Sequence, residues 1–401
     1  MNKKLDQIYL ALGCFVCLFM PLTSYAKALP NIISICMFLI LLIAKETSYK
    51  NFIKESFIKP LILFLAYIIL LSLFNLSTLK DYSEILNIIH LISLIFIFYN
   101  IKNKKYLINF FVLGVAISSL ITIYKILLLN QNLHSLVLAG AVVEEVFVTQ
   151  RLYLGLFILI SLIFCVDRLF KSNKKTNTIF NLTLIVFFSS LIFIFSSRSS
   201  IIIFLVVFLT LLIYKRRFFL KQKVYLATFC FILSVSIIVS WNTLEKRFLY
   251  SDDRESKDLI SKIVKHEPRF LIWKFSFEIF SENKNYLLGL GNKQTQDLLI
   301  GKYSKMENKK RSSWFIDREF NTHNQFLDFA LNYGLIGLIL FANLFIKLFF
   351  SLKKNIFAVS LILTLLIFTS LENALNRQIG IYLFAFLIII SADFIKQEAN
   401  E

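Results

Sequence analysis

Long apolar runs alternate with short polar segments along the chain, and this pattern predicts the fold class. A helix needs roughly 18 or more apolar residues to span a bilayer. Twelve runs approach or exceed this length and are predicted as membrane spans: 8–25, 29–45, 57–76, 84–100, 106–128, 152–170, 178–196, 199–214, 224–241, 325–350, 355–371 and 379–395. The strands of a β-barrel would alternate polar and apolar residues, which these runs do not. We therefore expect an all-α polytopic membrane protein.

One long hydrophilic stretch interrupts the spans and divides the chain into three parts. Residues 1–241 hold spans one to nine, residues 242–321 form a large loop with amphipathic helices, and residues 322–401 hold spans ten to twelve. The composition agrees with this class, because 57% of the residues are hydrophobic and the mean hydropathy is +0.71. A water-soluble domain could not hide that much apolar side chain.

The net charge of +19 is explained by topology rather than by a nucleic-acid partner. Lysine and arginine gather in every even-numbered loop between spans, while the short odd-numbered loops hold few. The positive-inside rule then places both termini in the cytoplasm and residues 242–321 on the outer side. No segment resembles a nucleic-acid-binding module.

Cysteines and acidic residues give no sign of a metal or another cofactor. The five cysteines lie inside apolar runs, and no pair has metal-binding spacing with nearby histidines. Asp252 and Asp253 are the only adjacent acidic pair in the large loop, and we interpret them as a solvated cluster.

The stretch "NTHNQFLDFALNYGLIG" (321–337) places His323 and Asn324 at the mouth of span ten. The 3–4 spacing predicts one packed helical face through His323, Leu327, Ala330, Gly334 and Gly337. Thr322 or Asn321 is predicted to cap the helix. The positive end of the helix dipole favours neutral imidazole, which a general base requires. The alternative is a capping or interface histidine without a catalytic role.

Several arginines are predicted to lie at the same outer boundary. Arg198 occupies the short turn between spans seven and eight, where a planar guanidinium suits phosphate binding. Arg269 opens "RFLIWKFSFEIF", in which Arg269, Trp273 and Phe277 share one face of an amphipathic helix predicted to rest on the bilayer. Snorkelling of Arg198 and simple membrane anchoring by the loop helix are the structural alternatives.

Three further ionisable residues belong to this boundary by the same topology. Arg151 begins span six, and Glu372 and Arg377 lie in the outer turn between spans eleven and twelve. Ionisable groups at membrane depth are candidates for function.

The combination resembles the O-antigen ligase and polymerase superfamily. The similarity rests on an arginine in a short outer turn, an R-x-x-x-W helix in a large loop, and "HN" followed by "YGLIG". It implies a GT-C-like fold in the bacterial inner membrane, with its active face in the periplasm. It also implies an undecaprenyl-pyrophosphate O-antigen donor and a lipid A-core acceptor. Arg198, Arg269 and His323 match the family's functional residues. Arg151 and Arg377 also match, but the residues that flank them are less distinctive.

The resemblance implies a glycosyltransferase that inverts the anomeric carbon and uses neither metal nor ATP. In this interpretation Arg198 and Arg269 stabilise the leaving pyrophosphate, and His323 accepts the proton of the acceptor hydroxyl. An O-antigen polymerase would use the same chemistry with a growing glycan as acceptor. A flippase or transporter, or a passive scaffold, is the alternative from another class.

Overall fold

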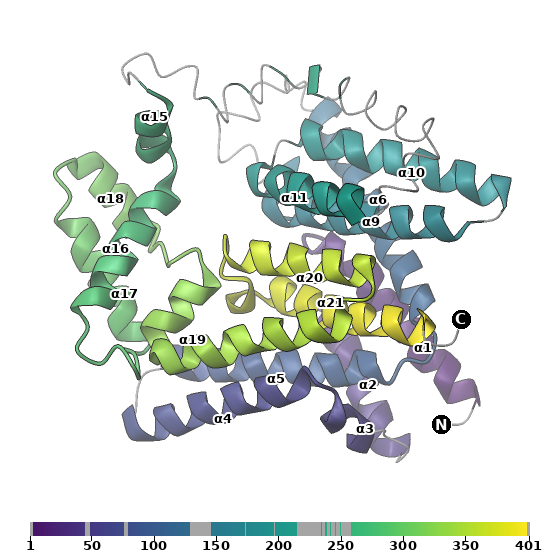
Figure 1. Cartoon of the computed structure of the whole chain (residues 1–401), viewed down its shortest axis with the longest axis horizontal. Coiled ribbons are helices and arrows are strands. Elements are labelled where there is room, and N and C mark those ends of the chain that lie inside the picture. Colours follow the sequence, from purple (N-terminus) through teal and green to yellow (C-terminus); the bar gives the residue numbers. More distant parts are fainter. Residues whose placement is uncertain are drawn as a thin grey trace.

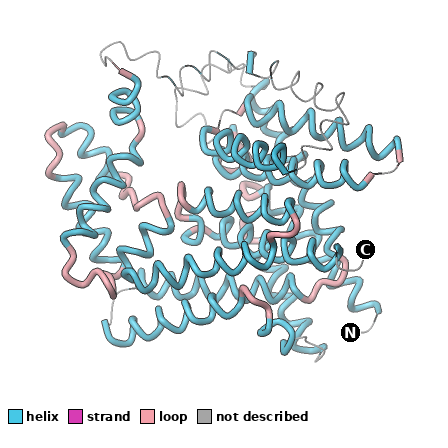
Figure 2. Tube along the Cα trace, in the orientation of Figure 1, coloured by secondary structure: helices cyan, strands magenta, loops and turns pink. Residues whose placement is uncertain are grey.

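Every regular element in the described part of the chain is a helix. The computed structural model describes residues 3–44, 49–75, 79–128, 146–172, 174–195, 197–214 and 258–398, with a few single positions between 234 and 249. Figures 1 and 2 show a bundle of roughly aligned helices with a smaller group of helices against one end. The bundle contains α1 (Lys3–Phe19), η1 (Met20–Leu22), α2 (Leu29–Ala44), α3 (Tyr49–Lys54), α4 (Ile58–Asn75), α5 (Leu79–Tyr99), α6 (Lys104–Leu128), α9 (Arg151–Lys171), α10 (Lys175–Ile194), α11 (Arg198–Tyr214), α19 (Gln325–Leu352), α20 (Ile356–Thr369), η3 (Ala374–Asn376) and α21 (Gln378–Glu398).

The bundle helices follow eleven of the twelve predicted spans, and the remaining range, 224–241, lies outside the described residues apart from single positions. By length and composition, six described helices can cross a membrane, and five more are apolar but shorter. The polytopic class is therefore confirmed, whereas the number of twelve spans stays a prediction.

Helix α9 lies at the centre of the bundle, with most of its side chains buried. It packs against α6, α10, α11 and α20. Gly155 permits the contact with α11, because a Cβ atom there would lie 2.4 Å from Ser200 Oγ and 3.0 Å from Ser197 Cβ. This close approach places the first turn of α9 beside the first turn of α11, where Arg151 and Arg198 begin their helices.

The smaller group, hereafter the loop helices, has a core of its own. It contains α15 (Leu259–His266), α16 (Pro268–Glu282), α17 (Asn292–Ser304) and α18 (Lys309–Asp317). Their buried core contains Ile272, Ile279, Leu299, Tyr303 and Phe315, joined by Leu331 from α19. Helix α19 therefore links the core of the loop helices to the core of the bundle.

Helix α19 is broken at Gly334, where φ is 67° and ψ is −171°. The break frees backbone groups, and residues 286–291 of the loop pair with them. Leu290 N and Gly291 N donate to Leu331 O and Asn332 O, and Leu335 N and Ile336 N donate to Tyr286 O and Leu287 O. We call this pairing the clasp. It satisfies the polar groups that a broken span would otherwise leave unpaired.

Two features hold the clasp. Gly334 and Gly289 both have positive φ and touch the opposite backbone, so neither position has room for a Cβ atom. Buried Glu84 of α5 accepts hydrogen bonds from Asn292 Nδ2, Asn332 Nδ2 and Tyr333 Oη. Residues 287–292 ("LLGLGN") are thus an ordered partner of the broken helix.

Candidate active site

The backbone around His323 is a turn that precedes α19 rather than the first turn of the helix. His323 has a φ of 45°, and its N–H donates to Asn321 Oδ1 at 3.1 Å. Asn324 is the N-cap, because its Oδ1 accepts from Phe326 N at 3.0 Å and Leu327 N at 3.1 Å. The predicted cap at Thr322 or Asn321 is therefore wrong.

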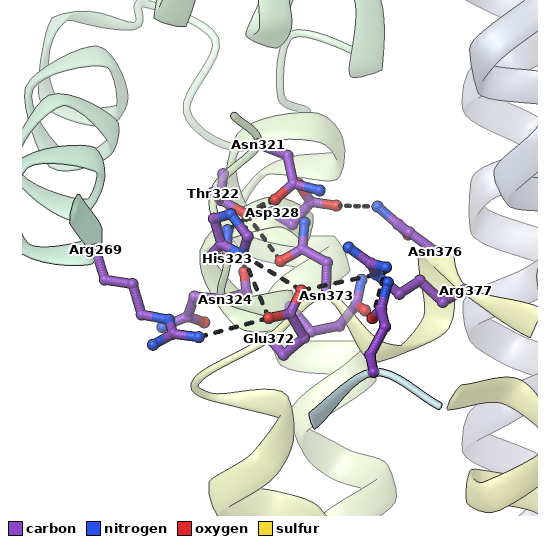
Figure 3. Close-up of polar contacts among 12 residues, drawn as sticks. Arg269, Asn321, Thr322, His323, Asn324, Asp328, Glu372, Asn373, Asn376 and Arg377 are labelled. Carbon is purple, nitrogen blue, oxygen red and sulfur yellow. Dashed lines mark hydrogen bonds and ion pairs between the residues drawn. The ribbon is translucent and has the colours of Figure 1, made fainter. Parts of the chain in front are cut away.

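The predicted helical face through His323 and Gly334 is also wrong. His323 lies outside the helix, and Gly334 interrupts it, so the 3–4 spacing does not continue across either residue. The close neighbour of Gly334 is the backbone of Leu287 in the loop. The turn instead directs the imidazole away from the helix axis, towards Glu372 (Figure 3).

Glu372 is buried and lies beside His323, with Nδ1 at 3.3 Å from both of its carboxylate oxygens. Burial raises the pKa of Glu372, but the hydrogen bond with His323 and the charges of His323, Arg269 and Arg377 outweigh burial, so the net pKa is lowered. An ionised carboxylate only accepts hydrogen bonds, so Nδ1 of a neutral imidazole carries the proton. Nε2 is then the basic nitrogen.

Two arginines approach the same carboxylate from different elements. Arg269 Nη2, from α16, lies 3.6 Å from Glu372 Oε2, and Arg377 Nε lies 3.9 Å from Oε1. Arg377 also donates from Nη1 to Gln150 Oε1, just before α9, at 2.8 Å. Glu372 therefore collects one histidine and two arginines from distant parts of the chain.

A second carboxylate, Glu267, joins the two arginines that the sequence singled out. Its Oε2 lies 2.6 Å from Arg198 Nη1, and its Oε1 lies 3.3 Å from Arg269 Nη1. Nε of Arg269 is buried without a hydrogen-bond partner in the described chain. Glu267 was not among the predicted site residues, although its position directly before "PR" was the available signal.

The remaining predicted residues lie at the edges of this group. Arg151 is near enough to Arg198 for their like charges to interact. Trp273 shares a face with Arg269, as predicted, but its Nε1 donates to Thr322 O at 3.1 Å and so ties α16 to the turn before His323. Phe277 further along that face is exposed.

Buried Asp328 fastens the histidine turn to the turn after α20. Thr322 Oγ1 lies 3.1 Å from Asp328 Oδ1 and 3.1 Å from Asn373 Oδ1, and Asn376 Nδ2 donates to Asp328 Oδ2 at 3.4 Å (Figure 3). Gln325 Oε1 accepts from Leu375 N at 2.9 Å. These contacts fix the position of Glu372 relative to His323, and none of them was predicted from the sequence.

The group carries a net positive charge that suits an anionic ligand. Four arginines and two glutamates leave two positive charges when the histidine is neutral: Arg151, Arg198, Arg269, Arg377, Glu267 and Glu372. Guanidinium groups bind phosphate oxygens through paired N–H donors. A base, Nε2 of His323, lies in the same group. The arrangement can therefore bind a phosphorylated substrate and accept a proton beside it.

A comparison with known families finds a match over the part of the chain that holds four of the residues in this group. The sequence model of a family described as O-antigen ligase matches residues 183–342, a range that includes Arg198, Glu267, Arg269 and His323. No curated protein matches the chain.

Proposed function

On the premise that residues 183–342 mark the chain as a member of the O-antigen ligase and polymerase superfamily, we propose that it is an O-antigen ligase. The proposed reaction transfers a glycan from an undecaprenyl-pyrophosphate carrier to the lipid A-core oligosaccharide. The reaction is proposed to occur at the periplasmic face of the bacterial inner membrane, with the loop helices in the periplasm. The membrane spans are proposed to have a GT-C-like arrangement. Loop charges support this orientation.

The observation that carries the proposal is the joint position of Arg198, Arg269 and the His323–Glu372 pair. Arg198 and Arg269 bind the two oxygens of one carboxylate, Glu267, so their guanidinium groups converge on a small anion. A pyrophosphate diester carries two negative charges, which match the net charge of the group. The donor would take the place of Glu267 between the two arginines.

The proton transfer is assigned to His323. Glu372 holds Nδ1–H, and Nε2 accepts the proton of the acceptor hydroxyl while its oxygen attacks the anomeric carbon. The bond between that carbon and the pyrophosphate oxygen breaks, and undecaprenyl pyrophosphate leaves with the electron pair. The arginines stabilise the charge that develops on the leaving group. Direct displacement inverts the anomeric carbon.

The test is transfer by the purified protein, supplied only with lipid-linked donor and lipid A-core acceptor. Glycan on lipid A-core supports the ligase, whereas longer lipid-linked glycan without acceptor consumption shows a polymerase. His323→Ala should bind donor and fail to transfer. Donor movement across vesicles without any new glycosidic bond would show a transporter and overturn the proposal.

A further inference from the structure

A polar pocket lies at the end of the bundle opposite the candidate active site. It is formed where α6 and α10 begin and α9 and α21 end, and its volume is about 390 Å³. Helix α9 has Arg151 at one end and Lys171 at the other, 21 residues apart inclusive, which at ~1.5 Å per residue is about 30 Å. The pocket is therefore separated from His323 by about the thickness of a bilayer core.

The floor of the pocket is basic and rich in hydrogen-bonding groups. Lys105, Arg168 and Lys171 line it together with Asn109, Asn177 and Asn181. Lys171 pairs with Asp167 at 3.2 Å, and Arg168 donates to Asn109 Oδ1. Asp393 lies 3.8 Å from Lys104. Lys105 is exposed and forms no ion pair with a carboxylate of the described residues. The lining has three basic and two acidic side chains and keeps a positive charge.

The wall of the same pocket is apolar. Ile108, Phe180, Ile390 and Phe394 complete the lining, and Phe180 is 62% exposed. Lys171 Nζ lies 5.0 Å from the ring centroid of Phe394, at the boundary of the two halves. An apolar wall next to a basic floor at a helix-bundle end suits a ligand with an anionic head and hydrocarbon chains.

We propose that this pocket binds the phosphate headgroup of an anionic phospholipid, with the acyl chains along Ile108 and Phe180. Basic pockets between the cytoplasmic ends of spans are typical sites for acidic lipid headgroups. The volume is within the range of small-ligand sites, about 300–1,000 Å³. The loop charges place this end on the cytoplasmic side, so the lipid belongs to the inner leaflet. The site is independent of the proposed transferase reaction.

The test is native mass spectrometry of the full-length protein in detergent, with phosphatidylglycerol or phosphatidylcholine added. The wild type should retain one phosphatidylglycerol and release phosphatidylcholine. Lys105→Ala with Arg168→Gln should weaken phosphatidylglycerol binding by about tenfold or more, since each substitution removes a charged donor to the phosphate. Phe180→Ala keeps every charge of the pocket and should weaken binding only through lost contact with the acyl chains of the lipid. The charge-matched control is Lys50→Ala with Lys54→Ala, on exposed positions outside the pocket.

Three results would overturn the proposal. The first is equal retention of the two lipids by the wild type. The second is an equal loss of lipid in the control and pocket variants, once both are shown to be monodisperse with unchanged melting temperature. The third is release of phosphatidylglycerol by millimolar inorganic phosphate, which would show a site for the free anion rather than for a lipid.

Discussion

Nδ1 of His323 lies 3.3 Å from both carboxylate oxygens of Glu372, although 49 residues separate the two along the chain. The pairing fixes which ring nitrogen carries the proton, because the ionised carboxylate can only accept. It leaves Nε2 as the base, so the role proposed for His323 depends on Glu372 as much as on the imidazole.

Glu372→Gln should therefore reduce transfer while donor binding is retained. A glutamine has the same shape but loses the charge that stabilises the imidazolium, and a hydrogen bond to a charged group contributes ~1.5–3 kcal/mol, or about ten- to a hundredfold in rate. The measurement is kcat and KM with purified protein. Exposed Glu307→Gln is the control and should leave both unchanged. A variant of Glu372 with wild-type kcat would contradict the assignment.

The same pair predicts how stability depends on pH. The pKa of Glu372 is lowered in the folded protein, so its stabilising contribution is complete above the ordinary glutamate pKa of ~4.3 and is lost as the pH falls through the lowered value. The difference in melting temperature between wild type and Glu372→Gln should therefore shrink as the pH falls below about 4. A difference in melting temperature that grows as the pH falls below about 4 would contradict the lowered pKa of Glu372.

Arg198→Lys and Arg269→Lys should each abolish most of the transfer. Lysine keeps the charge but loses the planar pair of donors that can hold two phosphate oxygens. The loss of such a contact to a developing anion costs on the order of 3 kcal/mol, about a hundredfold or more in rate. Exposed Arg318→Lys is the matched control. Full activity in either site variant would show that a point charge suffices.

Glu267→Gln should tighten donor binding. Glu267 pairs with both arginines in the structure, so the donor must displace its carboxylate. Partly exposed ion pairs contribute ~0.2–1 kcal/mol each, so removing both pairs should lower the donor Kd by roughly two- to thirtyfold. The measurement is binding of a labelled lipid pyrophosphate. Weaker binding would instead show that Glu267 holds the arginines in place for the donor.

Gly334→Ala should destabilise the protein by ~3 kcal/mol or more. The backbone conformation at Gly334 is nearly exclusive to glycine and costs other residues ~1–3 kcal/mol, and a Cβ atom would lie 2.2 Å from Leu287 O. Gly301→Ala is the control, because nothing lies within 4 Å of its Cβ position in α17. It should be neutral or slightly stabilising. Equal melting temperatures for the two variants would show that the clasp contributes little.

The topology prediction can be tested with single cysteines at Ser304 and Lys174, both exposed, in a background without native cysteines. An impermeant thiol reagent added to intact cells should label position 304 and not position 174, because the basic loops are placed in the cytoplasm. Labelling of both from outside would exclude the proposed orientation.

The sequence by itself determined the class and the approximate position of the spans. Long apolar runs such as 152–170 can only be satisfied as helices in a bilayer, so their length and hydropathy suffice to predict α9. The sequence also singled out Arg198, Arg269 and His323 as candidate site residues, because charged or titratable residues at the ends of apolar helices are conspicuous. Which side each loop occupies remains a prediction from charge alone.

Only the tertiary structure decided how these residues are paired. Glu267 and Glu372 contact arginines and a histidine from α11, α16, the turn before α19 and the turn after α20. No local spacing in the sequence encodes such contacts. The break in α19 at Gly334 could not be predicted from the sequence for a related reason. The sequence of α19 fits a continuous apolar helix, and the break is stable because residues 286–291, more than forty positions earlier, supply the backbone hydrogen bonds that it leaves open.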